Sequence, residues 1–283
     1  MALTEGQFQI RGLTLGCGTP YTVRGFNSFR HAARADQSGS RAWGHGSWSG
    51  AEWANEEAID LNILIKGGGV AGWMDANDAL AAALAPVGAD ASDVELRYVL
   101  GGREYLRYVR PRVHEPDPVH LGSGVVASVA SLAALDPLRY SGQESTATVG
   151  LPDFEGGLTV PTTVPFVIGA SLSEGAELLE NEGTADAPLR LRINGPVVQP
   201  RIALLRPDGE SEQLRFDTAL QAGQWLDVDT GARTVLLQGK TSRRAQTAGT
   251  FPLLPPGVST LRFFAAAHND DAEVTATWRS AWW

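Results

Sequence analysis

The glycine-rich run from Gly67 to Gly72 is the part of this sequence that comes closest to a known chemical motif. It reads Gly-Gly-Gly-Val-Ala-Gly, which satisfies the G-x-G-x-x-G spacing that holds a dinucleotide pyrophosphate at the start of a helix. The strand expected before it, Ile59 to Ile63, alternates apolar residues with polar ones. A parallel strand of a nucleotide-binding sheet is buried on both faces and is continuously apolar. No further strand–helix units follow, so we interpret the run as a flexible strand-to-helix connection and expect no bound nucleotide.

Metal-ligating and nucleophilic residue types are sparse. The segment from His114 to His120 holds two imidazoles and two carboxylates, which transition metals accept as ligands. Its two prolines indicate a stiff surface loop, and its spacing matches no known ligand frame. Cys17 is the single cysteine, which excludes an internal disulfide framework and a cysteine-rich metal site. We expect Cys17 to be a small, at least half-buried residue, because a catalytic thiol would need a histidine partner that the sequence does not place.

Paired carboxylates could serve a glycosidase, which uses two of them. Asp227 and Asp229 alternate with Leu226 and Val228 along an expected strand, which places both carboxylates on the solvent face. A second pair, at 270–271, falls in a turn, where aspartate is common for backbone reasons. Neither G-x-S-x-G nor H-E-x-x-H occurs in the sequence. We therefore expect no catalysis, no metal and no other cofactor.

Three tryptophans close the sequence: Trp278, Trp282 and Trp283. Left in water, they would form an adhesive apolar patch. We expect them to pack on their own domain or on a neighbouring chain, and a platform for a sugar ring is the alternative.

The composition favours a β-rich protein with many turns. Of 283 residues, 32 are glycine and 16 are proline; 43% are hydrophobic and 19% charged, which is too apolar for a disordered chain. Residues 1–140 carry 12 basic and 15 acidic side chains, residues 141–283 carry 11 and 17, and the net charge is −9. No Lys/Arg cluster exists to grip phosphates, so nucleic-acid binding is not indicated. No apolar run approaches the ~20 residues that cross a bilayer, and residues 1–16 do not resemble a signal peptide, so we expect cytosolic synthesis and no membrane insertion.

The elements that position these residues are expected to be short strands and a single helix. Alternation and turn signals predict strands at 8–11, 21–24, 59–63 and 125–135, and a hairpin at 94–110 that turns at Gly101-Gly102. Residues 35–51 are rich in Gly and Ser, contain two tryptophans, and are expected to form a long loop or mobile flap. The helix is expected at 76–84, with Asp75 or Asn77 as its cap.

The chain divides into parts of different character. Residues 1–140 predict a β-rich domain with the one short helix, and residues 141–160 are polar and interrupted by Gly and Pro, as an inter-domain linker is. Residues 161–283 contain only strand and turn patterns, with seven or more short strands, which is typical of an antiparallel β-sandwich or jelly roll. The predicted fold class is therefore mainly β.

Several short motifs follow one another in a particular order. The strand at 59–63, the helix and the hairpin lead to the ending Asp136-Pro137-Leu138-Arg139-Tyr140, and then come Gly156–Pro161, Asn181–Pro188, Phe251–Gly257 and Thr277–Trp282. In this order they resemble the distal tail protein family of long-tailed, non-contractile bacteriophages, also described as siphovirus-type tail components or minor tail proteins. The motifs are packing and turn signatures, so no catalytic residue is implied.

The resemblance implies a structural protein of the virion tail tip, made in the host cytoplasm, rather than an enzyme. Family members form hexameric rings through the N-terminal domain, and the ring joins the tail tube to the tail-tip hub or baseplate. Their C-terminal domain is a galectin-like sandwich that faces outward and anchors host-recognition parts. The implied partners are further copies of the chain, the tail tube protein and the tail-associated hub protein, with the tape measure and receptor-binding proteins as further candidates. DNA is expected to pass through the ring without specific binding. The alternative is a carbohydrate-binding module or depolymerase-type adhesin acting on host-wall polysaccharide.

The hairpin at 94–110 is the expected contact between neighbouring copies. Unpaired strand edges accept a neighbouring strand, and this hairpin carries apolar and aromatic residues on both faces near its end. The candidate interface residues are Tyr98, Leu100, Tyr105, Leu106, Tyr108 and Val109. The alternative is that the hairpin lies over the core of its own domain.

Overall fold

The chain folds into two compact units. The computed structural model describes residues 2–28, 34–36, 38–48, 50, 52–88, 92–117, 124–155, 171–173 and 175–283. One unit comprises Met1–Gly142 together with Trp283, and the other comprises Gln143–Trp282. Within the described ranges, no helix has the length and apolar character that a membrane span requires.

The first unit is built from antiparallel strands around one long strand. Its strands are β1 (Phe8–Ile10), β2 (Leu13–Leu15), β3 (Tyr21–Phe26), β8 (Glu57–Lys66), β9 (Val94–Leu100), β10 (Arg103–Asp117), β11 (Val125–Ala134) and β12 (Arg139–Ser141). Their order is β2-β1-β9-β10-β11-β8-β3, and β12 also pairs with β10. The first half of β10 pairs with β9 and its second half with β11. A register shift between Pro111 and Val113 lets one strand serve both parts of the sheet.

The expected alternation of β8 fills the core of this unit. Ile59, Leu61, Ile63 and Ile65 are all buried, because β8 is paired on both edges and turns one face inward. The helix α1 (Val70–Ala83) contributes Leu80, with Ala76 and Ala83, to the same core. A single α-helix is therefore present among the described residues, as the sequence predicts.

The expected start of the helix was wrong. The helix begins at Val70, with Gly69 rather than Asp75 or Asn77 in the cap position, and Gly69 makes no side-chain cap hydrogen bond. The reason is the close reversal after β8. A Cβ on Gly67 would lie 2.0 Å from the backbone nitrogen of Trp73, so the chain turns directly from strand to helix there.

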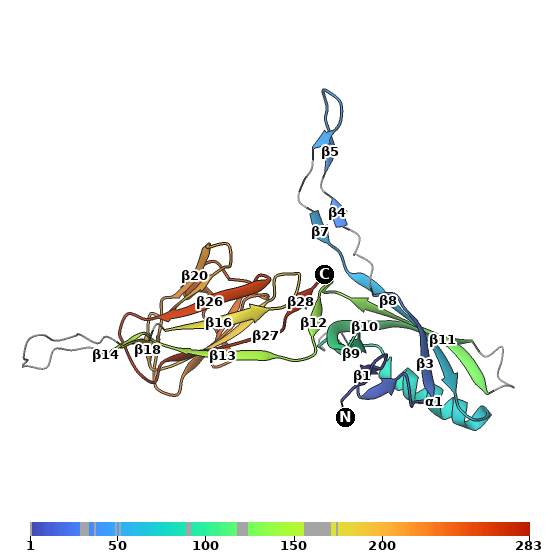
Figure 1. The fold of residues 1–283 in the computed structure, drawn as a ribbon. Coiled ribbons are helices and arrows are strands. Elements are labelled where there is room, and N and C mark those ends of the chain that lie inside the picture. Colours follow the sequence, from blue (N-terminus) through green and yellow to red (C-terminus); the bar gives the residue numbers. More distant parts are fainter. Residues whose placement is uncertain are drawn as a thin grey trace, which may run out of the picture. The chain divides into compact units, whose positions relative to one another are not determined.

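The segment expected as a loop or flap contains strand pairs instead. β4 (Arg34–Asp36) pairs with β7 (Glu52–Ala54), and β5 (Gly39–Ser40) pairs with β6 (Ser47–Trp48). Figure 1 shows these strands as a narrow ribbon that extends beyond the ends of β3 and β8. Gly39 lies opposite Trp48, and a Cβ on Gly39 would lie 2.7 Å from its indole, so the ring covers the glycine. Its Gly/Ser-rich composition hides the pairing because few residues there alternate in hydrophobicity.

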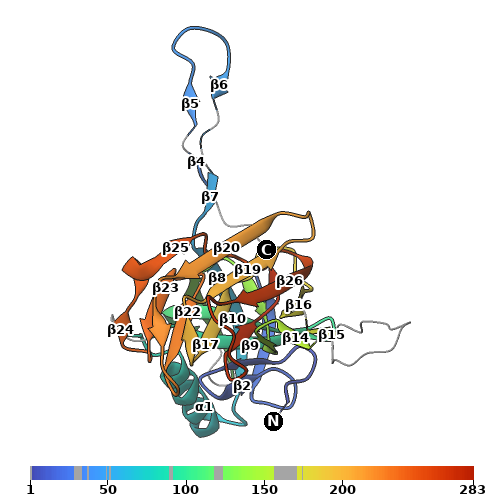
Figure 2. The same ribbon diagram turned by 90° about the vertical axis from the view of Figure 1, so that its left-hand side faces the viewer.

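The second unit is a β-sandwich of two antiparallel sheets, which Figure 2 shows as separate layers. The six-stranded sheet has the order β13 (Ser145–Gly150), β27 (Glu273–Trp278), β17 (Leu189–Asn194), β22 (Trp225–Asp229), β23 (Thr234–Leu237) and β24 (Thr241–Ser242). The five-stranded sheet has the order β16 (Ala176–Asn181), β26 (Gly257–Phe264), β19 (Arg201–Leu205), β20 (Ser211–Phe216) and β25 (Thr247–Gly249). A single-turn 3-10 helix, η2 (Arg244–Gln246), precedes β25. Two short strand pairs also belong to this unit: β14 (Asp153–Glu155) with β15 (Ser171–Ser173), and β18 (Val197–Val198) with β21 (Ala219–Leu220). Its last strand is β28 (Ala281–Trp282).

The mainly β fold class is confirmed, and the galectin-like classification of the sandwich stays a prediction. β13 lies inside the segment 141–160 that was expected to be a linker. Its six residues pair with β27 from Ser145–Trp278 to Gly150–Glu273. Residues 156–160 of that segment lie outside the described residues.

One buried amide organises the motif at the start of the sandwich. The Asn181 Nδ2 donates to the carbonyl oxygens of Ala185 and Leu254, at 2.8 and 2.9 Å. Its Oδ1 accepts from the Gly183 and Ala281 amides, at 3.0 and 3.2 Å. Asn181 is 1% exposed, and its side chain bonds four backbone groups, two in the adjoining turn and two in the distant segments at Leu254 and Ala281.

Candidate functional site

The glycine-rich run lies in a setting that does not suit a nucleotide. The preceding strand β8 pairs with β3 and β11, and both pairings are antiparallel. A dinucleotide fingerprint belongs to a parallel strand–helix–strand unit. The run instead has a packing role, because a Cβ on Gly72 would lie 1.9 Å from the Gly67 carbonyl oxygen.

The histidine and cysteine candidates do not assemble a site. His114 lies on β10, where partial burial lowers its pKa, and its Nε2 has no hydrogen-bond partner in the described structure. His120, with residues 118–119, lies outside the described residues. Across the described ranges, no group of three His, Cys, Asp or Glu side chains is arranged to hold a metal. Cys17 is exposed and not half-buried as expected, because it lies in a turn between Gly16 and Gly18, both of which have positive φ.

The carboxylates of Asp227 and Asp229 have structural partners. Asp227 accepts from Arg192 Nε at 2.8 Å and from Trp225 Nε1 at 2.9 Å. Asp229 lies 4.0 Å from Arg190 and accepts from a backbone amide of the following turn. Leu226 and Val228, which alternate with these aspartates along β22, are buried, and this confirms the predicted alternation.

The closing tryptophans divide into two kinds. Trp278 and Trp282 are buried, and Trp278 Nε1 donates to the Glu180 carbonyl oxygen at 2.8 Å. Trp283 keeps 49% of its surface exposed. Trp278 and Trp282 therefore pack on their own chain, which is one of the two arrangements expected from the sequence.

The six candidate interface residues occupy different environments. Tyr98, Leu106 and Val109 are buried within the protomer. The Tyr98 ring lies 4.9 Å from Phe26 and 5.5 Å from Tyr105, so it belongs to the core of the first unit. Its burial also raises the pKa of its phenol. These three side chains account for the hairpin's apolar character without a partner.

The other three candidates are only partly buried. Leu100 and Tyr105 pack against the edge of the same core, and the Tyr108 ring lies 5.9 Å from that of Tyr140. Each keeps part of its surface exposed. Their assignment to an interface between copies stays a prediction.

The ribbon presents the largest exposed aromatic side chains of the first unit. Trp43 is 97% exposed, Trp53 64% and Trp48 54%. Exposed tryptophans are residues of the kind that marks protein contacts, and this narrow ribbon carries three of them. Trp43 and Trp48 are the two tryptophans of the Gly/Ser-rich segment 35–51, and the sequence alone does not predict the strand pairing that exposes them.

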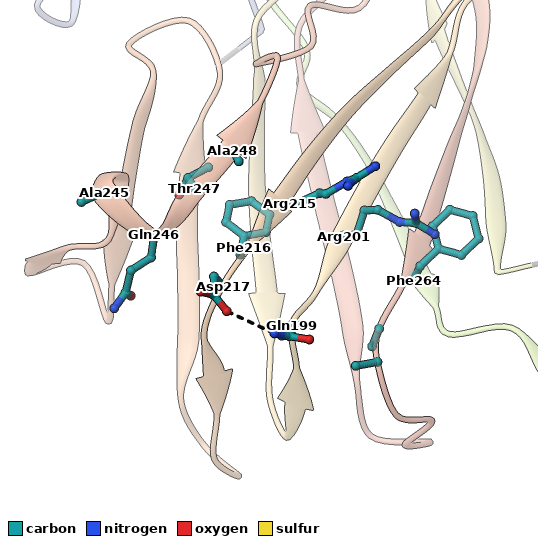
Figure 3. Close-up of a pocket in the computed structure, with 12 residues that line it drawn as sticks. Gln199, Arg201, Arg215, Phe216, Asp217, Ala245, Gln246, Thr247, Ala248 and Phe264 are labelled. Carbon is teal, nitrogen blue, oxygen red and sulfur yellow. Dashed lines mark hydrogen bonds between the residues drawn. The ribbon is translucent and has the colours of Figure 1, made fainter.

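A second surface, which the sequence analysis missed, lies on the five-stranded sheet. A hollow of about 750 Å³ is lined by residues from β19, β20, β25 and the end of β26. Figure 3 shows Arg215, Arg201 and Phe264 following one another across three strands. The Arg201 guanidinium carbon lies 4.6 Å from the centre of the Phe264 ring. Only the register of three strands brings these residues together, and no sequence motif marks them.

Comparisons with known proteins give a family match in the second unit and similar folds over nearly the whole chain. Residues 182–282 match the family of siphovirus-type tail components, C-terminal domain. The crystal structure of Dit from phage SPP1, described as a paradigm of the hub adsorption apparatus in phages that infect Gram-positive hosts, is similar at a TM-score of 0.63. The two chains share 12% identity over 97% of this chain and 98% of that one.

Two structures of the phage p2 baseplate in its activated conformation are also similar. The strontium form gives a TM-score of 0.50 at 9% identity, and the calcium form gives 0.51 at 8%. Each covers 96% of this chain and 97% of the matched chain. The curated proteins include no detectable sequence match. The resemblance expected from the sequence is therefore confirmed: residues 182–282 match the C-terminal domain of siphovirus-type tail components, and the whole chain is similar in fold to the SPP1 Dit protein.

Proposed function

We propose that this chain is a structural distal tail protein whose six copies form the ring that joins a phage tail tube to the tail-tip hub or baseplate. The observation that carries the proposal is the fold shared with the SPP1 Dit protein over 97% of the chain, together with the family match in the second unit. In this proposal the protein is made in the host cytoplasm and is assembled into the virion. The ring also anchors host-recognition parts.

The exposed ribbon supports an assembling protein. A ring needs a surface on one copy that fits a different surface on the next copy. Each tryptophan contributes about 150–250 Å² of contact when buried, which makes the three on this ribbon strong anchors for a neighbouring copy. The exposed parts of Leu100, Tyr105 and Tyr108 on the hairpin are the second candidate surface.

The remaining features of the first unit agree with a passive conduit. We propose that DNA passes through the ring without specific binding, since residues 1–140 carry a net charge of −3 and no basic cluster. We also propose that the protein has no catalytic activity. The carboxylates that could have served a glycosidase are held in ion pairs and turns.

The test is the mass of the full chain in solution, measured by native mass spectrometry and by electron microscopy of stained particles. A hexamer of 30.1 kDa chains has a mass of about 181 kDa and a ring-shaped projection. A chain that stays monomeric at every concentration, and also in the presence of the tail tube protein, would contradict the proposal. That result would favour the carbohydrate-binding alternative.

Substitutions distinguish the two candidate surfaces. The double variant Trp43→Ser/Trp48→Ser is expected to weaken the hexamer, and Tyr105→Ser/Tyr108→Ser tests the hairpin in the same way. Leu178→Ser is the matched control, because Leu178 is 66% exposed but lies in the second unit. Loss of assembly with the hairpin variant alone would move the interface from the ribbon to the hairpin.

A further inference from the structure

The five-stranded sheet places two arginines directly opposite each other. Arg201 of β19 pairs with Arg215 of β20, so both side chains leave the sheet on its outward face. Like charges in directly opposite positions destabilise a sheet. Neither guanidinium has a carboxylate partner within the described residues. Because the protein carries a net charge of −9, the presence of two adjacent arginines without acidic partners needs an explanation.

The other sheet of the same sandwich shows the usual arrangement. There Arg192 lies opposite Asp227 and Arg190 lies opposite Asp229, at N–O distances of 2.8 and 4.0 Å. These pairs also line a hollow, of about 600 Å³, in which each positive charge faces a negative one. The missing acidic partners therefore distinguish the hollow on the five-stranded sheet from its neighbour.

The far end of the hollow is polar and hydrogen-bonding. Gln199 Nε2 donates to Asp217 Oδ1 at 3.1 Å, as the dashed line in Figure 3 marks. Gln246 and Thr247 add an amide and a hydroxyl to the lining. Gln199 has a φ of 48°, a left-handed conformation that is uncommon for a residue with a side chain and that often accompanies binding sites. The hollow thus has a cationic end and an end rich in neutral and acidic hydrogen-bonding groups.

We propose that this hollow binds an anionic saccharide, meaning a sugar unit that bears a carboxylate or a phosphate. The guanidinium groups of Arg201 and Arg215 bind the oxyanion, since a guanidinium matches carboxylate and phosphate oxygens in a two-pronged geometry. Gln199, Asp217 and Gln246 bind the sugar hydroxyls. The volume, about 750 Å³, lies within the range of small-ligand sites and far exceeds what a lone ion would need.

The charge distribution favours a saccharide over other anions. Nucleic acid carries a charge on every unit, and the acidic second half of the chain, with 11 basic and 17 acidic residues, would repel such a polymer. An acidic peptide likewise has closely spaced charges and few hydroxyls to meet Asp217. A saccharide with a single anionic group next to neutral hydroxyls fits both ends of the hollow. The site lies within the second unit and does not rest on ring formation.

The test is the affinity of the full chain for defined probes, measured by calorimetric titration and by saturation-transfer NMR. The probes are glucuronic acid and glucose 6-phosphate, with glucose, inorganic phosphate and an oligoglutamate as comparisons. We expect one or both anionic sugars to bind and to receive saturation, and the one that binds more tightly identifies the oxyanion. Glucose and inorganic phosphate are expected to bind at least ~10-fold more weakly, because each offers only half of the contacts.

Variants assign the binding to the hollow. Arg215→Gln is expected to weaken binding of the anionic sugar about tenfold or more, because it removes a charge-assisted contact while leaving an exposed strand position intact. Arg262→Gln is the matched control: Arg262 lies on the same face of β26 but does not line the hollow, and we expect less than about a twofold change.

Three results would overturn the proposal. Absence of binding by both anionic sugars would remove the site. Equal effects of Arg215→Gln and Arg262→Gln would reduce the interaction to a general charge effect. Binding of inorganic phosphate or oligoglutamate as tight as that of the sugars would assign the surface to a lone anion or to an acidic protein segment.

Discussion

A buried ion pair in the first unit yields a sharp prediction about stability. Arg107 on β10 is 0% exposed, and its Nη2 donates to Glu57 Oε2 at 2.6 Å. The same guanidinium donates to the Ser28 hydroxyl at 2.6 Å and to the Pro137 carbonyl oxygen at 2.9 Å. A single side chain therefore ties together the end of β3, the start of β8 and the turn before β12.

The perturbation is Glu57→Gln, which keeps the shape of the side chain and removes its charge. It leaves the Arg107 guanidinium buried with only neutral acceptors, and an uncompensated buried charge costs about 3–5 kcal/mol of unfolding free energy. Because glutamine can still accept one hydrogen bond, we expect the lower end, about 3 kcal/mol. That loss is a large share of the 5–15 kcal/mol that stabilises a typical domain.

Hydrogen exchange followed by mass spectrometry measures the loss in each unit separately. Amides of β8 and β11 that exchange through unfolding of the first unit should exchange about 100-fold faster in Glu57→Gln. Peptides of β17 and β27 in the second unit serve as the internal reference. Glu56→Gln is the control, since it makes the same change at an exposed neighbouring position.

The effects of substituting Arg107 and Glu57 on stability should not add. The double variant Arg107→Met/Glu57→Gln should be more stable than Glu57→Gln alone, because it leaves no uncompensated charge in the core. A loss below about 1 kcal/mol for Glu57→Gln would refute the reasoning, since it would mean that water or another group neutralises the guanidinium.

Three further predictions concern other parts of the chain. Gly67→Ala and Gly72→Ala should each destabilise the first unit by about 2–4 kcal/mol in thermal unfolding, because the added Cβ would overlap backbone atoms at 2.0 and 1.9 Å; Gly68→Ala, at a φ of 65° but with open space around it, should cost only about 1 kcal/mol. Asn181→Leu should destabilise the second unit by about 3 kcal/mol or more in denaturant unfolding, since it removes the hydrogen-bond partner of the Gly183 and Ala281 amides and of the Ala185 carbonyl oxygen and leaves the Leu254 carbonyl oxygen with the Ala187 amide alone; an effect under about 1 kcal/mol would show that these groups find other partners. Backbone hydrogen bonds from the hairpin turn lower the pKa of Glu5 below its ordinary 4.5, so the carboxylate should hold this turn at neutral pH and release it as the pH falls below about 4.5. Amide exchange of that turn, compared with Glu5→Gln, which should lose the pH dependence, checks the sign.

The sequence by itself determined most of the strands. The Gly101-Gly102 turn, which joins β9 to β10, and the alternation of β8 are local signals, because two glycines with positive φ and a period of two are visible without any partner. The predicted strands of the second half, among them β17, β19, β22 and β26, are present for the same reason. The ordered motifs also indicated the family. One of them begins at Asn181, whose amide holds the sandwich ends together.

Tertiary structure decided what each surface presents. The apolar residues on both faces of the hairpin suggested an interface, yet Tyr98, Leu106 and Val109 are buried in the protomer, because β10 is covered on both faces near its middle. The start of the helix depended on a close approach between Gly67 and Gly72, and no cap signal encodes that approach.

The arginine pair on the sandwich shows most clearly what the sequence alone does not predict. Arg201 and Arg215 are 14 positions apart, and nothing in the chain between them predicts that they face each other. Their meeting depends on the register of β19 with β20, as the contact with Phe264 depends on the register of β19 with β26. A shift of one residue would send either arginine to the opposite face, since successive side chains of a strand alternate between faces. Local propensity places residues in strands, but the packing of the buried face selects the register, and the register determines which charges share a surface.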